Sequence, residues 1–141
     1  MAKLVEIRNL KVEAKTDSGR RVEIIRGVSF DIQEGEIVAL IGESGSGKTT
    51  IALTLMGYAR PGCRISGGEV LLAGKDMASL SEKARAKIRG TEVAYIPQSA
   101  AAAFNPAQTI MEQVIEITRI HDLMPVEDAK ARAVELFKAL S

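Results

Sequence analysis

The sequence predicts an α/β fold in which a small antiparallel β subdomain precedes alternating strands and helices. Three observations predict it. Residues 4–32 carry short β-type runs separated by turn residues, and residues 36–41 form an apolar run typical of a strand buried on both faces. A glycine-rich loop then joins that run to a helical segment. With 141 residues, the chain has the length of a single domain.

The first 35 residues are predicted to form the antiparallel β part. Thr16–Gly19 has the composition of a turn, and Glu34–Gly35 supplies another turn where this part ends. Between and around these turns, the runs with strand character are residues 4–7, 11–14, 22–25 and 28–32.

Residues 36–105 are predicted to form the core of the α/β fold. Apolar runs, capping residues and glycines mark its elements. We expect a buried strand at 37–41, a helix at 48–56 that Gly57 ends, and a strand at 69–73 that Gly74 ends. A capping box of Ser79 and Glu82 should open the next helix, which runs to about Arg89 and is stopped by Gly90. A second buried strand is expected at 93–96, ended by Pro97.

Residues 106–141 are predicted to begin a helical subdomain. A capping box of Thr109 and Glu112 opens a helix that runs to about Ile120, and a last helix starts near Pro125. Its apolar stripe continues to Ser141 without a stop signal. We therefore expect the chain to be the N-terminal portion of a longer, incomplete domain, with an unpaired sheet edge that favours self-association.

Composition excludes several classes of protein. Hydrophobic residues make up 46% and charged residues 26%, and 19 basic residues nearly cancel 18 acidic ones, so no strong field favours nucleic acid. No apolar run is long enough to span a membrane or to serve as a secretory signal. Cys63 and His121 are the only residues of their types, so no Cys/His metal cluster is expected. A cytoplasmic protein fits these features best.

A GxxxxGK[ST] motif at residues 42–49 carries the predicted chemistry. Its glycines allow backbone N–H groups to converge on a polyphosphate, and the following helix contributes the partial positive charge of its first turn. Lys48 would reach the β- and γ-phosphates, and the Thr49 hydroxyl would ligate Mg²⁺. This predicts a P-loop site for a nucleoside triphosphate, with contacts from Gly42, Glu43, Ser44, Gly45, Ser46, Gly47, Lys48, Thr49 and Thr50.

Further segments share a resemblance with one P-loop family. Besides the loop, they are Val28–Ile32 followed by Glu34–Glu36, Gly67–Val70 with Gly74–Asp76, and Tyr95–Gln98. In this order and over the whole length, the chain resembles the ATP-binding subunit of ABC transporters. The Gly-Glu-Ser-Gly-Ser-Gly-Lys form of the loop, together with Phe104-Asn105-Pro106, is similar to importers of the dipeptide, oligopeptide and nickel group.

The resemblance implies a cofactor, partners and a second catalytic position. The cofactor would be ATP with Mg²⁺, and Gln98 would act with Lys48 by contacting Mg²⁺ and the region of the attacking water. The Ser99–Pro106 loop would face membrane-spanning transporter subunits. A second ATP-binding subunit would complete a head-to-tail dimer, and the protein would lie in the cytoplasm on the inner face of the cell membrane.

Two departures from the family pattern limit what the chain can do. The aromatic residue that stacks on adenine in the family aligns with Ala14, so phosphate contacts would dominate binding. The signature motif, the Walker B strand with its catalytic Glu, and the switch His would all follow Ser141. The Ile65–Glu69 run reads like the signature, but it leads into a strand. We therefore expect ATP binding with negligible hydrolysis.

Two other classes remain as alternatives: a complete small P-loop enzyme such as a metabolite kinase, and a non-catalytic nucleotide-binding regulatory module. Nothing after Gln98 resembles the Asp-bearing strand or Arg-rich lid of a kinase. The basic residues of the predicted helix before Gly90 are interpreted as a solvated face, and His121 as a cation at a helix C-terminus. Cys63 is interpreted as either a packed small residue or an incidental exposed thiol. The basic residues in question are Lys83, Arg85, Lys87 and Arg89.

Overall fold

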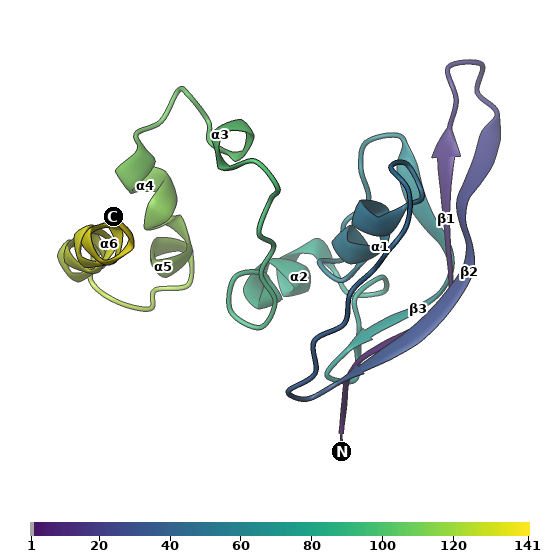
Figure 1. The fold of residues 1–141 in the computed structure, drawn as a ribbon, viewed down its shortest axis with the longest axis horizontal. Coiled ribbons are helices and arrows are strands. Elements are labelled where there is room, and N and C mark those ends of the chain that lie inside the picture. The colour runs from purple at the N-terminus through teal and green to yellow at the C-terminus, as the bar shows by residue number, and fades with distance from the viewer. Residues whose placement is uncertain (1) are drawn as a thin grey trace. The chain divides into compact units, whose positions relative to one another are not determined.

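The computed structural model describes residues 2–141, except for the side chain of Ala100. The described residues form two compact units, one extending to Tyr95 and the other comprising Ile96–Ser141 (Figure 1). Both helices and strands are present, which confirms the predicted mixed α/β class. Each unit is described by itself.

A four-stranded antiparallel sheet dominates the first unit. Its order is β2-β1-β3-β4, so β1 lies between two long neighbours (Figure 1). The turn predicted at Thr16–Gly19 joins β1 to β2, where Gly19 adopts a φ of +82° and the Thr16 amide donates to the Arg20 carbonyl over 2.7 Å. The strands are β1 (Lys3–Lys15), β2 (Arg21–Gln33), β3 (Cys63–Leu72) and β4 (Lys75–Asp76).

The four strand-like runs predicted in residues 4–32 merge into two 13-residue strands. Irregularities in the pairing separate the halves of β1, where Asn9 adopts a φ of +48° and its amide donates to Ser29 Oγ over 2.8 Å. A bulge of this kind bends a strand without ending it. The gap between the predicted runs at 4–7 and 11–14 therefore corresponds to a bulge within one strand.

The core of the first unit lies between the sheet and two helices. Leu10 and Val12 from β1 and Val70 from β3 are fully buried. Ile51 from α1 (Lys48–Thr54) and Ile88 from α2 (Glu82–Ile88) join the same cluster. Cys63 packs against its edge, as interpreted from the sequence. The sheet is thus the platform that holds α1 and the loop before it.

The two strands predicted to be buried in the core are not formed, so this prediction was wrong. Residues 37–41 and 94–96 have no strand assignment, and Val93 makes only an isolated bridge to Arg89. Ile37 is 97% exposed, Ile41 94% and Ile96 91%. A parallel strand depends on hydrogen bonds to neighbouring strands, and neither run pairs with a strand among residues 2–141. Apolar composition alone therefore did not bury these runs.

The start of α2 also corrects the sequence prediction. The cap is Ser81, whose Oγ accepts from the Ala84 amide over 3.2 Å, whereas Ser79 donates its hydroxyl to the Asp76 carbonyl. Glu82 consequently stands at the first helical position instead of closing a capping box. Gly90, with a φ of +86°, follows the last residue of the helix region as predicted.

The second unit consists of helices α3 (Ala100–Ala103), α4 (Ile110–Val114), α5 (Glu116–Ile120) and α6 (Val126–Leu140). The capping box of Thr109 and Glu112 is confirmed, with backbone-to-side-chain bonds of 3.1 and 3.2 Å. The single helix predicted after it is interrupted at Ile115, where ψ is 0°. Ile115 turns into the small core of this unit with Ala129 and Ala133 of α6.

Two smaller features complete the second unit. The Ser99–Pro106 segment, predicted as a loop, includes the four-residue helix α3. His121 ends α5, which places it at a helix C-terminus as interpreted from the sequence. Across residues 2–141, no helix combines the length and the apolar character needed to cross a bilayer.

Candidate functional site

The glycine-rich loop leads directly into α1. Gly45 and Gly47 have φ values of +83° and +94°, and Gly47 is the N-terminal cap of the helix. The Ser46 amide donates to the Glu43 carbonyl over 3.1 Å, and the Ile51 amide donates to the Gly47 carbonyl over 2.9 Å. A Cβ at position 47 would lie 2.5 Å from Cδ1 of Ile25. Glycine is therefore needed at 47 for both conformation and space.

The loop closes tightly on itself at its first residue. A Cβ at position 42 would lie 2.6 Å from Oγ of Ser46 and 3.8 Å from Cδ of Lys48. The backbone of Gly42 thus lies directly against side chains from the far end of the loop. This close approach shows that a side chain at position 42 would collide with Ser46. That the loop cradles a polyphosphate stays a prediction.

Lys48 lies across the loop. Its Nζ donates to the carbonyl of Gly42 and, over 2.9 Å, to the carbonyl of Glu43. An ammonium group has three N–H donors, so these two bonds leave one for an anion. The loop therefore holds a positive charge at the amino end of α1, where the helix dipole also favours negative ligands.

The hydroxyl residues of the first turn complete the loop. Thr49 is exposed and Thr50 half-buried. A hydroxyl oxygen suits a hard cation such as Mg²⁺, which binds proteins through few ligands and takes the rest from water and phosphates. Among the described residues, no three His, Cys, Asp or Glu gather into a metal-binding group. The exposed Thr49 hydroxyl is an oxygen donor of the kind that Mg²⁺ takes, and its role as a Mg²⁺ ligand stays a prediction.

Gln98 belongs to the second unit, whereas the loop belongs to the first. Its side chain is exposed and it follows Pro97 in an irregular segment. Its approach to the phosphate site therefore stays a prediction. The Ile65–Glu69 run lies inside β3, which confirms that it is part of a strand and not a helix-opening motif.

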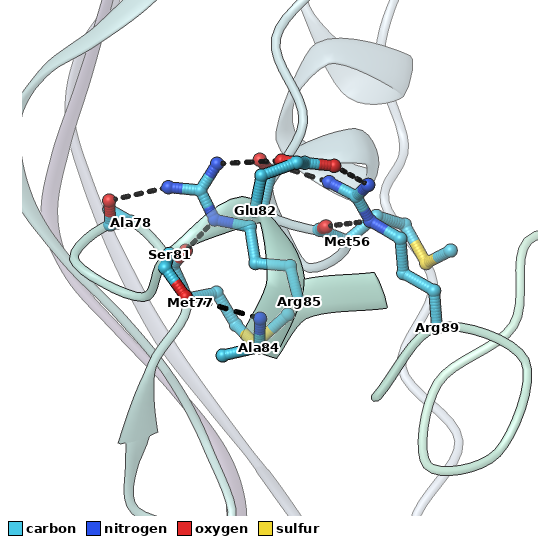
Figure 2. Close-up of polar contacts among 9 residues, drawn as sticks. Met56, Met77, Ala78, Ser81, Glu82, Ala84, Arg85 and Arg89 are labelled. Carbon is cyan, nitrogen blue, oxygen red and sulfur yellow. Dashed lines mark hydrogen bonds and ion pairs between the residues drawn. The ribbon is translucent and has the colours of Figure 1, made fainter. Parts of the chain in front are cut away.

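The interpretation of the α2 basic residues as a solvated face was wrong for two of the four. Lys83 and Lys87 are exposed, but Arg85 and Arg89 are half-buried and donate to backbone carbonyls. Glu82 accepts from both guanidinium groups (Figure 2). A signal was present in the sequence, because Glu82, Arg85 and Arg89 recur at helical spacing and so share one helix face.

Sequence reasoning also missed Gln113, which organises the segment after Phe104. Its Oε1 accepts from the Asn105 amide over 2.7 Å, and its Nε2 donates to the Asn105 carbonyl over 2.9 Å. The same Nε2 lies 3.2 Å from the Gln108 carbonyl. Phe104 stands beside this fixed turn with 39% of its surface exposed. No motif spacing indicated this role for Gln113.

One acidic group in the sheet is perturbed electrostatically. A hydrogen bond from Arg64 lowers the pKa of Glu13 below its ordinary value, and a second bond from Arg21 acts in the same direction against the effect of partial desolvation. The Arg64 and Arg21 nitrogens lie 2.5 and 3.0 Å from Oε1 of Glu13. These ion pairs link β1, β2 and β3 beside Ala14, the position aligned with the adenine-stacking residue.

The chain belongs to the ABC transporter family, whose sequence model matches residues 25–141. The chain is 40% identical over 139 residues to the oligopeptide transport ATP-binding protein AppD of Bacillus subtilis, covering 98% of this chain and 42% of AppD. It is 37% identical to the oligopeptide transport ATP-binding protein OppD of the same species, covering 98% of this chain and 38% of OppD. The dipeptide transport ATP-binding protein DppD of Lactococcus lactis is 39% identical over 137 residues, covering 96% and 39% of the two chains. The chain thus spans about two fifths of the length of these relatives.

Proposed function

We propose that residues 42–50 bind ATP with Mg²⁺, and that the chain supplies the ATP-binding part of a transport-coupled ATPase in an ABC importer. The observation that carries this proposal is the loop itself. Its close-packed glycines and the Lys48 ammonium, held by two loop carbonyls, form a compact, positively charged cradle at the start of α1. Membership of the ABC transporter family supports ATP as the nucleotide.

The proposal gives separate tasks to the loop backbone, Lys48, Thr49 and Gln98. The backbone amides and Lys48 neutralise the phosphates, and Thr49 helps to hold Mg²⁺. When bound, Mg²⁺ withdraws charge from the phosphate oxygens. Gln98 contributes from the second unit by orienting the attacking water and contacting the metal region.

The proposed cargo is a peptide, nickel or a similar small solute. The names of the relatives, which are oligopeptide and dipeptide transport proteins, support a peptide. We assign the Ser99–Pro106 segment to contact with membrane-spanning subunits, since Phe104 is partly exposed beside a turn fixed by Gln113. A second ATP-binding subunit would close a head-to-tail dimer on the inner face of the cell membrane. Co-purification with the membrane subunits, lost in Phe104→Asp, tests this assignment.

For the 141 residues alone we expect binding with little turnover. Transfer of a phosphoryl group to water requires an oriented nucleophile in addition to charge neutralisation. The loop supplies charge neutralisation. The proposal assigns none of the loop residues as a carboxylate that orients the attacking water. ATP should therefore remain largely intact when it is bound.

A retention assay with labelled Mg²⁺-ATP tests the proposed function. The purified chain is incubated, washed rapidly, and the bound nucleotide is identified as ATP or ADP. We expect retained ATP in the wild type and in Lys75→Ala, a variant with the same charge change at a surface lysine paired with Glu92. Lys48→Ala should retain none. Equal retention in all three proteins would contradict the proposal, and steady Lys48-dependent release of ADP would indicate a complete enzyme.

A further inference from the structure

The turn after α1 is bound by Arg89, the residue that directly follows α2. Arg89 donates through Nε to the Met56 carbonyl over 2.8 Å, and its Nη2 lies 3.5 Å from the Gly57 carbonyl (Figure 2). Met56 and Gly57 lie in the turn that follows α1, whose own last carbonyls accept from the amides of that turn. Their carbonyls thus stand just beyond the negative end of the helix dipole. A guanidinium group there both satisfies acceptors and opposes the dipole.

Glu82 fixes the orientation of this arginine. Its Oε1 accepts from Nη1 of Arg89 over 2.5 Å, and its Oε2 accepts from Nη1 of Arg85 over 3.4 Å. Only 26% of the Arg89 side chain and 21% of the Arg85 side chain are exposed. Figure 2 shows the Glu82 carboxylate between the two guanidinium groups. Because Ile88, the last residue of α2, is buried in the core, both α2 with Arg85 and the adjacent Arg89 are firmly placed.

α1 depends on such anchors because it is short. It has seven residues, whereas isolated helices shorter than about 12–15 residues are marginal in water. Its amino end carries Lys48 and the loop, and its carboxyl end carries the contacts with Arg89. At a rise of about 1.5 Å per residue, the two ends are about 10 Å apart. Any tilt of the carboxyl end therefore moves the loop.

We propose that Arg89 is a positioning residue for the phosphate-binding loop. It holds the carboxyl end of α1 in place, so that Lys48 and the loop amides keep the geometry that binds nucleotide. The proposal rests on the proposed function for its ligand. In this proposal Arg89 acts on the loop through α1.

Arg85, which lies within α2, provides a matched control for Arg89, which directly follows that helix. It also pairs with Glu82 and also donates to two carbonyls, each over 2.8 Å, but these belong to Met77 and Ala78 in the connection between β4 and α2. Its aliphatic part packs near Gly57, where a Cβ would lie 2.7 Å from Cδ of Arg85. Substitution by Met keeps an aliphatic side chain at either position and removes only the guanidinium group.

The test compares Arg89→Met with Arg85→Met in two measurements: the dissociation constant of Mg²⁺-ATP, and amide hydrogen exchange of Leu55, Met56 and Gly57 without nucleotide. We expect affinity to fall about tenfold in Arg89→Met and to change by less than about twofold in Arg85→Met, at similar unfolding midpoints. Exchange should accelerate only in Arg89→Met. Arg89→Lys, which keeps the charge but not the fork, should recover part of the affinity.

Equal effects of the two Met variants would overturn the proposal, because they would show a general structural role for both arginines. A wild-type chain that binds no nucleotide would instead contradict the proposed function. In that case the exchange measurement still decides whether Arg89 anchors α1, since it requires no ligand. Unchanged exchange in Arg89→Met would overturn the anchoring.

Discussion

The antiparallel sheet and the unpaired apolar run at 37–41 both belong to the first unit, but they differ in burial: β1 mixes apolar with charged residues and is buried on one side, whereas the fully apolar run at 37–41 is not. Both are rich in β-branched and aliphatic residues. In β1, pairing with β2 on one side and β3 on the other leaves Leu10 and Val12 fully buried. In the run at 37–41, Ile37 and Ile41 are almost fully exposed. Of these two extended segments, the apolar residues are buried in the one that pairs with neighbouring strands.

The largest expected effect is a loss of unfolding free energy on truncating a buried residue of β1. Leu10→Ala removes a fully buried side chain from the sheet core and should lower the free energy of unfolding by about 2–5 kcal/mol. Ile37→Ala removes a 97% exposed side chain and should change it by less than about 0.5 kcal/mol. Urea denaturation of both variants measures the difference. Similar losses of unfolding free energy in the two variants would show that Ile37 is packed in solution. They would contradict the difference in burial between β1 and the run at 37–41.

The junction between sheet and loop offers the next test. Gly47→Ala places a Cβ against Ile25 at a φ of +94°, and should cost about 1–3 kcal/mol of unfolding free energy. Gly45→Ala meets nothing within 4 Å at a similar φ of +83°, so only the backbone term applies, about 1 kcal/mol. Thermal unfolding of the two variants tests this order. A larger loss at position 45 would contradict the packing of the loop on β2.

The exposed apolar run at 37–41 predicts self-association of the chain. Apolar side chains at 37 and 41 stand in water and can be buried by a second molecule. Ile37→Ser with Ile41→Ser should reduce the association constant several-fold, since about 25 cal/mol is lost per Å² of apolar contact. Sedimentation equilibrium at tens of micromolar measures it. A wild-type chain that is strictly monomeric would contradict the prediction.

The smallest effect concerns the ion pairs that link three strands at Glu13. Because the folded-state pKa of Glu13 is lowered, first by the hydrogen bond from Arg64, this contribution to stability is present above the unfolded-state pKa. It is lost as pH falls through the lower folded-state value. Arg64→Gln should raise the pKa of Glu13 towards its ordinary value, as an NMR pH titration of its carboxyl carbon would show. An unaltered titration would exclude the Arg64 bond as the cause.

Local patterns in the sequence predicted much of the fold, and tertiary pairing decided the rest. The Thr16–Gly19 turn, the Thr109 capping box and the helix after Gly47 depend on residues within a few positions of each other, and all three are present. The runs at 37–41 and 93–96 needed partners distant in the chain. The cap of α2 was misplaced because Ser79 and Ser81 both offer a hydroxyl, and only the folded turn at Asp76 distinguishes them.

The same distinction applies to the candidate site. The glycines and Lys48 could be predicted because the motif places backbone donors and an ammonium group in one short loop. The spacing of Glu82, Arg85 and Arg89 indicates a shared face, but the partners of Arg89 and Gln113 could not be predicted, because the positions of those carbonyls and amides depend on the folding of other segments. Such side-chain-to-backbone contacts between distant segments are found from packing and not from motif spacing.

Calorimetric titration with Mg²⁺-ATP tests the central claim most directly, which is that Lys48 and its loop form a phosphate-binding site. Wild type, Lys48→Ala and the matched Lys75→Ala should be compared at equal folded concentration. We predict that Lys48→Ala weakens binding at least about thirtyfold, equivalent to about 2 kcal/mol, and that Lys75→Ala binds as the wild type does. Equal affinities for the two lysine variants would contradict the account, because nucleotide would then bind somewhere other than the loop.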